Sequence, residues 1–265
     1  MSNDSIKKTV IVALGVCLVC SILVSTAAVA LKPRQEKNKK LEKMVNILEV
    51  GGLYEKGVDV EKVFAEQLEA LIIELKSGDV LPKDKYGDML QPGKYDIKKV
   101  AKDAKYGEAI PGKEDKAKIK RKPKYMLVYY VKEGGKRTKL ILPVYGKGLW
   151  STMYGFLALD MDLKRVKGYT VYDHGETPGL GGEVENPKWQ ASWQGKIVFD
   201  DNDKLILEVI KGKVDPTGPK AKYRIDGLSG STLTTRGVDN LLKFWLRESG
   251  YGPFFKKIRE ASSDG

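Results

Sequence analysis

An uncharged apolar run near the start of the chain limits what the rest can fold into. Residues Thr9 to Leu31, TVIVALGVCLVCSILVSTAAVAL, are long enough to cross a bilayer as one helix. The run is longer than a usual signal-peptide core, which favours an uncleaved anchor, although Ala28-Val29-Ala30 resembles a signal-peptidase site and keeps cleavage open. We therefore expect residues 1–33 to form a single-pass membrane anchor and residues 34–265 to form an α+β domain outside the membrane.

Basic residues lie on both sides of this run. Lys7 and Lys8 precede it, and a larger group follows it: Lys32, Arg34, Lys37, Lys39 and Lys40. The positive-inside rule would keep the domain in the cytoplasm, but long domains often translocate regardless of flanking charge. The residues alone therefore leave the orientation open.

The overall charge is basic, with 47 Lys+Arg against 35 Asp+Glu. Much of the excess lies in LKPRQEKNKKLEK after the apolar run and in KEDKAKIKRKPK, residues 113–124, where it could contact anionic lipid or acidic partner subunits. Neither stretch belongs to a nucleic-acid reading motif, so we expect no nucleic-acid partner. Cys17 and Cys20 both lie in the apolar run, and His174 is the only histidine, so we expect no metal site.

The remaining pattern predicts a mixed, mainly antiparallel sheet with flanking helices. A helix from Glu36 should end at Gly51-Gly52, and a second should run from the N-cap Asp59 to Ser77-Gly78. Residues 81–124 are expected to be irregular. Strands are expected at 125–131 and 139–145, joined through Gly134-Gly135, and then from residues 153, 166, 196 and 204. A short helix should start at Asn186-Pro187, and the final helix at about Thr235.

Three glycine-rich segments each lie next to an expected strand. They are GKGLWS at 146–151, DHGETPGLGGE at 173–183, and the junction within YRIDGLSGSTLTTRGVDNLLKFW at 223–245. Glycines let backbone N–H groups approach a ligand, and a helix N-terminus favours a phosphate. The set predicts a cleft for a flat, phosphorylated, partly apolar cofactor, with Trp150 as an aromatic wall. Taken alone, the junction could also be a hydroxyl-rich helix cap.

The usual catalytic and nucleotide fingerprints are missing. The chain has no GxGxxG opening a strand–helix unit and no GxxxxGK[ST], and Ser229 lies outside any GxSxG elbow. His174 could equally be a loop residue held by hydrogen bonds or a functional one.

The stretch Asp226-Gly227-Leu228-Ser229-Gly230-Ser231-Thr232 resembles the flavinylation motif D-G-x-[ST]-G-[AS]-T of the FMN-binding family. With GKGLWS and HGETPGLGGE in this order, the likeness extends over nearly the whole chain to the C-subunit family of Na+-translocating NADH:quinone reductases. It implies that Thr232 carries covalent FMN through a phosphoester, attached by a flavin transferase. Alanine is commoner than Ser231 before that threonine, so the Ser231 hydroxyl is a second candidate acceptor.

The resemblance also implies the residues around the cofactor and the region that holds it. The FMN-binding core should span about 125–248. The expected FMN-binding residues are Gly148, Leu149, Trp150, Ser151, Glu176, Thr177, Gly179, Leu180, Gly181, Asp226, Ser229, Gly230, Ser231, Leu233 and Thr234. No catalytic residue is expected beyond the flavin itself.

The implied activity is electron transfer within a sodium-transporting oxidoreductase of the bacterial inner membrane, with the domain facing the periplasm. The FMN would take electrons from an iron or iron–sulfur centre and pass them to the FMN of the B subunit. The partners would be the A, B, D, E and F subunits, and turnover would need the whole complex, because no motif here binds NADH, quinone or Na+.

Two alternatives stay open at this point. One is the G subunit of the Rnf complex, which shares the threonine-linked FMN domain but fits the insertion between Gly51 and Lys124 less well. The other is a membrane-anchored basic assembly protein without a cofactor. Covalent flavin would separate the second alternative from both flavoproteins.

Overall fold

The computed structural model describes residues 5–263, which divide into two units with the boundary between Lys43 and Met44. The helix α1 (Ile6–Gly51) fills the described part of the first unit and continues into the second. Its apolar side chains up to Leu31 are exposed, and the helix is long and apolar enough to cross a membrane. The expected anchor and the helix expected from Glu36 are thus one helix, which continues past Pro33.

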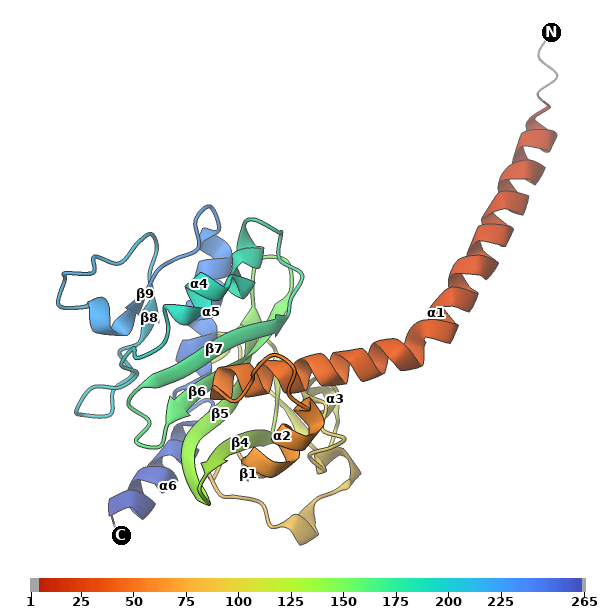
Figure 1. Ribbon diagram of the computed structural model, residues 1–265. Helices are drawn as coiled ribbons and strands as arrows, with labels where there is room; N and C mark the ends of the chain where they lie inside the picture. Colours follow the sequence, from red (N-terminus) through yellow and green to blue (C-terminus); the bar gives the residue numbers. More distant parts are fainter. Residues whose placement is uncertain (1–4, 264–265) are drawn as a thin grey trace. The chain divides into compact units, whose positions relative to one another are not determined.

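A five-stranded antiparallel sheet forms the core of the second unit, in the order β1-β4-β5-β6-β7 (Figure 1). The strands are β1 (Leu68–Glu74), β4 (Tyr125–Glu133), β5 (Lys136–Lys147), β6 (Thr152–Asp160) and β7 (Val166–Asp173). Gly134 and Gly135 make the β4–β5 turn with φ of +58° and +81°, as the pattern predicted. The mainly antiparallel α+β architecture is therefore confirmed.

Helices pack on both faces of this sheet. The Cα of Gly51, in the last turn of α1, lies so close to Ile141 of β5 that an added Cβ would be 3.2 Å from Cδ1. The helix α5 (Thr232–Trp245) packs Leu241 against Gly146 of the same strand. Ile141 and Gly146 point to opposite faces, because side chains alternate along a strand.

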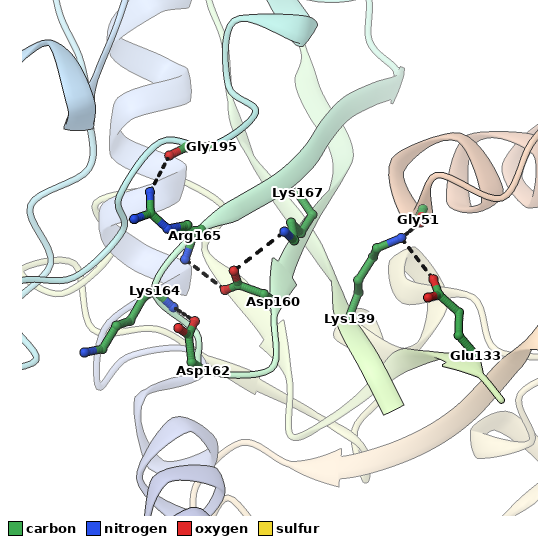
Figure 2. A network of polar contacts seen from close by, with 9 residues as sticks. All are labelled: Gly51, Glu133, Lys139, Asp160, Asp162, Lys164, Arg165, Lys167 and Gly195. Carbon is green, nitrogen blue, oxygen red and sulfur yellow. Dashed lines mark hydrogen bonds and ion pairs between the residues drawn. The ribbon is translucent and has the colours of Figure 1, made fainter. Parts of the chain in front are cut away.

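The expected end of α1 at Gly51-Gly52 is confirmed, and side chains reinforce it. Gly52 has φ of +71°, and the Leu53 amide donates to the Leu48 carbonyl at 2.8 Å, so the helix closes in a Schellman motif. Lys139 Nζ donates to the Gly51 carbonyl at 2.7 Å and lies 3.3 Å from Glu133 Oε1 (Figure 2). The sheet thus supplies a cation to the carboxyl end of the helix.

The helix predicted from Asp59 to Ser77 is wrong in its second half. Asp59 caps α2 (Val60–Gln67) and accepts from the Lys62 amide at 3.1 Å, but the chain becomes β1 at Leu68. Every residue of β1 pairs with β4, from Leu68 opposite Val131 onward. Pairing with a buried strand overrides the helical spacing of the apolar residues.

Other boundaries also differ from the sequence expectations. The stretch 81–124 contains α3 (Ile97–Lys102) and the β2–β3 pair (Gly107–Ala109, Arg121–Pro123) in addition to two short 3-10 helices, Lys83–Lys85 and Asp88–Leu90. The strand expected from residue 196 is reduced to isolated bridges, and that from 204 to β8 (Glu208–Val209), which pairs with β9 (Arg224–Ile225). Two further 3-10 helices cover Gly181–Glu185 and Ala221–Tyr223.

The helices near the C-terminus complete the fold. α4 (Pro187–Ala191) starts after Asn186 as expected, but α5 starts at Thr232 rather than Thr235. A further helix, α6 (Gly252–Ser263), follows α5 and was not predicted. Just before it, the Tyr251 hydroxyl donates to the Pro143 carbonyl of β5 at 2.6 Å. Buried bonds of this kind fix the ends of the last two helices against the sheet.

Candidate functional site

The three glycine-rich segments meet around one buried carboxylate, that of Glu176. The first segment follows β5, the second follows β7, and the third opens α5. Glu176 is 5% exposed, and it accepts hydrogen bonds from the backbone N–H groups of Leu149, Trp150 and Ser151 at 3.1, 2.9 and 3.1 Å. The Thr234 hydroxyl of α5 donates to Glu176 Oε2 at 2.6 Å. One side chain therefore ties all three segments together.

Two glycines make room for this carboxylate. A Cβ on Gly148 would lie 2.6 Å from Glu176 Oε1, and one on Gly181 would lie 2.6 Å from Thr234 Oγ1. Both distances are far below van der Waals contact, so neither position accepts a side chain without displacing the network. These glycines serve close packing around Glu176.

The hydrogen bonds decide the protonation state of Glu176. Burial raises the pKa of its carboxyl, but the bonds from Thr234 and from the amides of Ser151, Trp150 and Leu149 together outweigh burial. The pKa is therefore lowered below its ordinary value, and Glu176 is ionised at neutral pH. It is a hydrogen-bond acceptor rather than a proton donor.

The start of α5 contains a short chain of hydroxyls. Ser231, the N-cap residue, donates through Oγ to Thr234 Oγ1 at 2.8 Å, and Thr234 in turn donates to Glu176. Thr235 Oγ1 donates to the Ser231 carbonyl at 2.9 Å and accepts from the Leu228 amide at 2.9 Å. Ser231, Thr234 and Thr235 are all buried, so their hydroxyls are committed to this arrangement.

Thr232 differs from these neighbours because its side chain is exposed. It is the first residue of α5 and comes two residues after Gly230, whose φ of +70° sets the turn before the helix. The hydroxyl therefore lies at the positive end of a helix dipole and is open to solvent. Among the hydroxyls of the α5 start, it is the one best placed to react.

A cleft of about 370 Å³ lies beside Thr232, and we call it the Trp150 cleft. It is lined by Leu149, Trp150, Glu176, Thr177, Leu180, Gly181, Gly230, Ser231, Thr232, Leu233 and Thr234. Its four large apolar residues, Leu149, Trp150, Leu180 and Leu233, are 40 to 66% exposed. Exposed apolar groups gathered around a hollow mark a binding site more than a packing defect.

The remaining predicted residues lie near this cleft but do not line it. Ser151 Oγ accepts from the Gly175 amide at 2.6 Å, Gly148 lies against Glu176, and Gly179 takes a turn conformation with φ of +74°. Asp226 Oδ1 accepts from the Val214 amide at 2.7 Å. Ser229 is exposed at the turn before α5. Ser151 and Asp226 therefore hold loops, and none of these five predicted residues lines the Trp150 cleft.

His174 holds a loop through one ring nitrogen. Its Nδ1 accepts from the Glu176 amide at 3.0 Å, and its Nε2 lies 2.9 Å from Glu185 Oε1. Of the two roles that the sequence left open, the geometry fits the structural one. It orients the residue at the centre of the site.

Sequence reasoning missed two residues that support the site. A Cβ on Gly237 would lie 2.5 Å from the Lys147 carbonyl, so this glycine lets α5 approach the end of β5. Lys147 Nζ donates to the Trp150 carbonyl at 2.7 Å and closes the loop that carries the aromatic wall. A glycine inside a helical pattern was the available signal for Gly237. Lys147 lies within the GKGLWS segment, but no pattern distinguishes it from its neighbours there.

Comparison with known proteins agrees with this arrangement. The model of the FMN-binding domain family matches residues 148–247, which run from Gly148 to just beyond α5 and include most of the three segments. The chain is 48% identical to the C subunit of the Na(+)-translocating NADH-quinone reductase of Pseudomonas aeruginosa, covering 99% of each chain. The chain belongs to the C-subunit family of Na(+)-translocating NADH-quinone reductases. The resemblance seen in the sequence is thereby confirmed.

Other members of this family support the assignment at the level of sequence and fold. The C subunit from Yersinia pestis is 44% identical, with 98% of this chain and 96% of that one covered. The crystal structure of NqrC from Shewanella oneidensis superposes with a TM-score of 0.74 at 32% identity, covering 85% of this chain and 99% of that one. As a C subunit, the chain is part of an oxidoreductase complex and carries an FMN-binding domain.

Proposed function

We propose that this chain is the covalent-FMN electron-transfer subunit of the complex, with FMN esterified through its phosphate to the hydroxyl of Thr232. When bound, FMN supplies electron transfer in one-electron steps, here between an iron or iron–sulfur centre and the FMN of the B subunit. The observation that carries the proposal is the exposed Thr232 hydroxyl at the start of α5, beside a cleft with exposed apolar walls.

The residues present fit a flavin phosphate ester. Trp150, Leu149, Leu180 and Leu233 offer apolar and aromatic surface to a flat ring, and the Thr177 side of the cleft adds a polar edge. The buried hydroxyls of Ser231 and Thr234 are already bonded, which favours Thr232, the exposed threonine at the start of α5, as the acceptor. The same bonds disfavour Ser231, which the sequence left as a second candidate.

Glu176 acts through position rather than contact. Its carboxylate holds the 148–151 loop and the start of α5 at fixed separation, so the cleft keeps its shape before and after loading. A preformed cleft needs little rearrangement when charge changes on the bound group. Walls that remain largely open to solvent suit transfer to a partner better than a closed substrate pocket does.

The proposed setting is the bacterial inner membrane, with α1 as the single span and the domain in the periplasm. The helix meets the length and apolarity that a span requires. The A, B, D, E and F subunits would be the partners, and a flavin transferase would attach the cofactor. A cysteine at exposed Gly112, probed in intact cells with a membrane-impermeant maleimide, tests the orientation: labelling is expected, and protection would place the domain inside.

The flavin assignment is tested by in-gel fluorescence of the denatured full chain, co-expressed with a flavin transferase. The wild type is expected to give a fluorescent band and Thr232→Ala to give none. The control Thr217→Ala, at an exposed threonine outside the motif and the Trp150 cleft, should match the wild type. A dark wild-type band would refute the flavoprotein assignment and favour an assembly protein without cofactor. Fluorescence that survives Thr232→Ala but disappears in Ser231→Ala would move the linkage to Ser231.

A further inference from the structure

Thr232 borders a second cleft as well as the Trp150 cleft. This second cleft has a volume of about 650 Å³ and lies on the side of Ser229, Gly230 and α4. Its lining includes the lysines Lys188, Lys211 and Lys213, so we call it the lysine cleft. The acceptor residue thus stands between two hollows whose linings differ.

The lining of the lysine cleft has more positive than negative groups, three lysines against two carboxylates. Among the described residues, the ammonium groups of Lys188, Lys211 and Lys213 make no ion pair or hydrogen bond, and all three residues are exposed. The cleft also contains two carboxylates, and both have partners. Glu183 Oε2 accepts from Asn186 Nδ2 at 2.6 Å, and Asp226 Oδ1 accepts from the Val214 amide at 2.7 Å. Three lysines against two carboxylates leave the lining with a net positive charge, and no lysine is paired with either carboxylate.

The Trp150 cleft has the opposite character. Glu176 is the single charged residue in its lining, and hydrogen bonds keep its carboxyl ionised by lowering the pKa despite burial. An anion in this cleft would face a carboxylate and no cation. Like charges at short range cost free energy, while exposed lysines favour a phosphate. The lysine cleft therefore suits the anionic part of a ligand, and the Trp150 cleft suits an uncharged, apolar part.

We propose that the lysine cleft is a phosphate subsite: the phosphodiester on Thr232 faces Lys188, Lys211 and Lys213, while the flavin ring occupies the Trp150 cleft. This inference rests on the proposed linkage at Thr232 and adds which side of the residue each part of the ligand takes. The ligand class is a phosphodiester monoanion. The Ser229 hydroxyl, exposed in the same cleft, is a further donor to it.

Arg236 is the competing cation and must be tested separately. It lies four residues after Thr232 on α5, which places the two side chains on one helix face. It is exposed, and among the described residues its guanidinium has no hydrogen bond or ion pair. It does not line either cleft beside Thr232. A phosphate that turned along the helix would pair with Arg236 rather than with the lysines.

The test is 31P NMR of the flavin-loaded full chain in detergent. The variants are Lys188→Gln/Lys211→Gln/Lys213→Gln, Arg236→Gln, and the control Lys56→Gln/Lys76→Gln/Lys136→Gln, whose exposed lysines lie outside both clefts. In the cleft variant the resonance is expected to move toward its position in the urea-denatured protein. Raising NaCl from ~0.05 M to ~0.5 M should move the wild-type signal the same way, because salt screens exposed charges. The visible flavin spectrum should not change.

The outcomes separate this inference from the function on which it rests. The lysine subsite is overturned if the 31P resonance of the cleft variant stays at the wild-type position, or if the resonance moves only in Arg236→Gln. In either case the flavin remains on Thr232. A wild-type chain without flavin overturns the proposed function instead. If the triple cleft variant acquires no flavin, the three single substitutions are measured in its place, and unchanged resonances in all of them overturn the subsite.

Discussion

Two carboxylates near the ends of neighbouring strands form polar networks that differ in how far apart in the sequence their partners lie. Glu176, after β7, accepts from amides 25 to 27 residues earlier and from a hydroxyl 58 residues later. Asp160, at the end of β6, accepts from the Arg165 amide at 3.0 Å and lies 3.8 Å from Lys167 Nζ (Figure 2). One network joins distant segments, whereas the other closes a single turn.

The two networks also shift their carboxyl pKa values in opposite directions. Hydrogen bonds lower the pKa of Glu176 against the effect of burial. Burial raises the pKa of Asp160, and a hydrogen bond with Asp162 raises it further. Several hydrogen-bond donors stabilise the charged form of a carboxylate. Burial and a hydrogen bond from a second carboxyl group favour the protonated form instead. Glu176 therefore organises a site, whereas Asp160 organises a hairpin.

The largest effect is expected from Glu176→Ala compared with Asp160→Ala. Loss of the Glu176 carboxylate leaves three amides and the Thr234 hydroxyl without their acceptor, so the free energy of unfolding should fall by ~2–4 kcal/mol. Asp160→Ala should cost ~1 kcal/mol or less. Urea unfolding of the full chain in detergent, followed by tryptophan fluorescence, measures both. Equal losses would remove the distinction between site and turn.

Gly148→Ala should cost somewhat less, ~1–3 kcal/mol, because its Cβ would lie 2.6 Å from Glu176 Oε1 and force the carboxylate away from its amides. Gly112→Ala is the matched control, since a Cβ there meets nothing within 4 Å. The same unfolding measurement applies, together with the yield of flavin attachment. A Gly148→Ala protein as stable as Gly112→Ala would show that the network tolerates displacement.

The contributions of Glu176 and Asp160 to the free energy of unfolding should change in opposite directions as pH is lowered. The folded pKa of Glu176 is below its unfolded value of 4.5, so its stabilisation is present above pH 4.5 and is lost as pH falls through the folded pKa. The folded pKa of Asp160 is raised, so its contribution decreases as pH rises through that pKa. Free energies of unfolding measured below pH 5 should therefore depend less on pH in Glu176→Gln than in the wild type. A steeper dependence in that variant would contradict this assignment.

The smallest change in stability is expected at the cleft rim, outside both networks. Leu233 is 52% exposed, so Leu233→Ser should alter the free energy of unfolding by less than ~0.5 kcal/mol. In the flavin-loaded chain it should nevertheless shift the flavin fluorescence, because it removes part of the apolar wall. Exposed Val80, 45% accessible and remote in sequence, provides the control through Val80→Ser. An unchanged flavin signal in Leu233→Ser would argue that the ring does not contact this rim.

Several features were predictable because short-range rules govern them. The Asp59 cap, the Gly134-Gly135 turn and the end of α1 at Gly51-Gly52 each follow from residues within a few positions. The switch from α2 to β1 at Leu68 was not predictable in this way. The apolar spacing there suits a helix, and pairing with β4 decides for a strand.

The site divides along the same line. The sequence by itself determined the membrane-length apolar helix, the order of the three glycine-rich segments, and the place of Thr232 at the end of the D-G-x-[ST]-G-[AS]-T pattern, since each is written in consecutive residues. Only the tertiary structure decided that Glu176 serves as a structural tie and that Thr232 stands between an apolar cleft and a cationic one. Those facts depend on contacts across 25 to 58 residues, which no local pattern encodes.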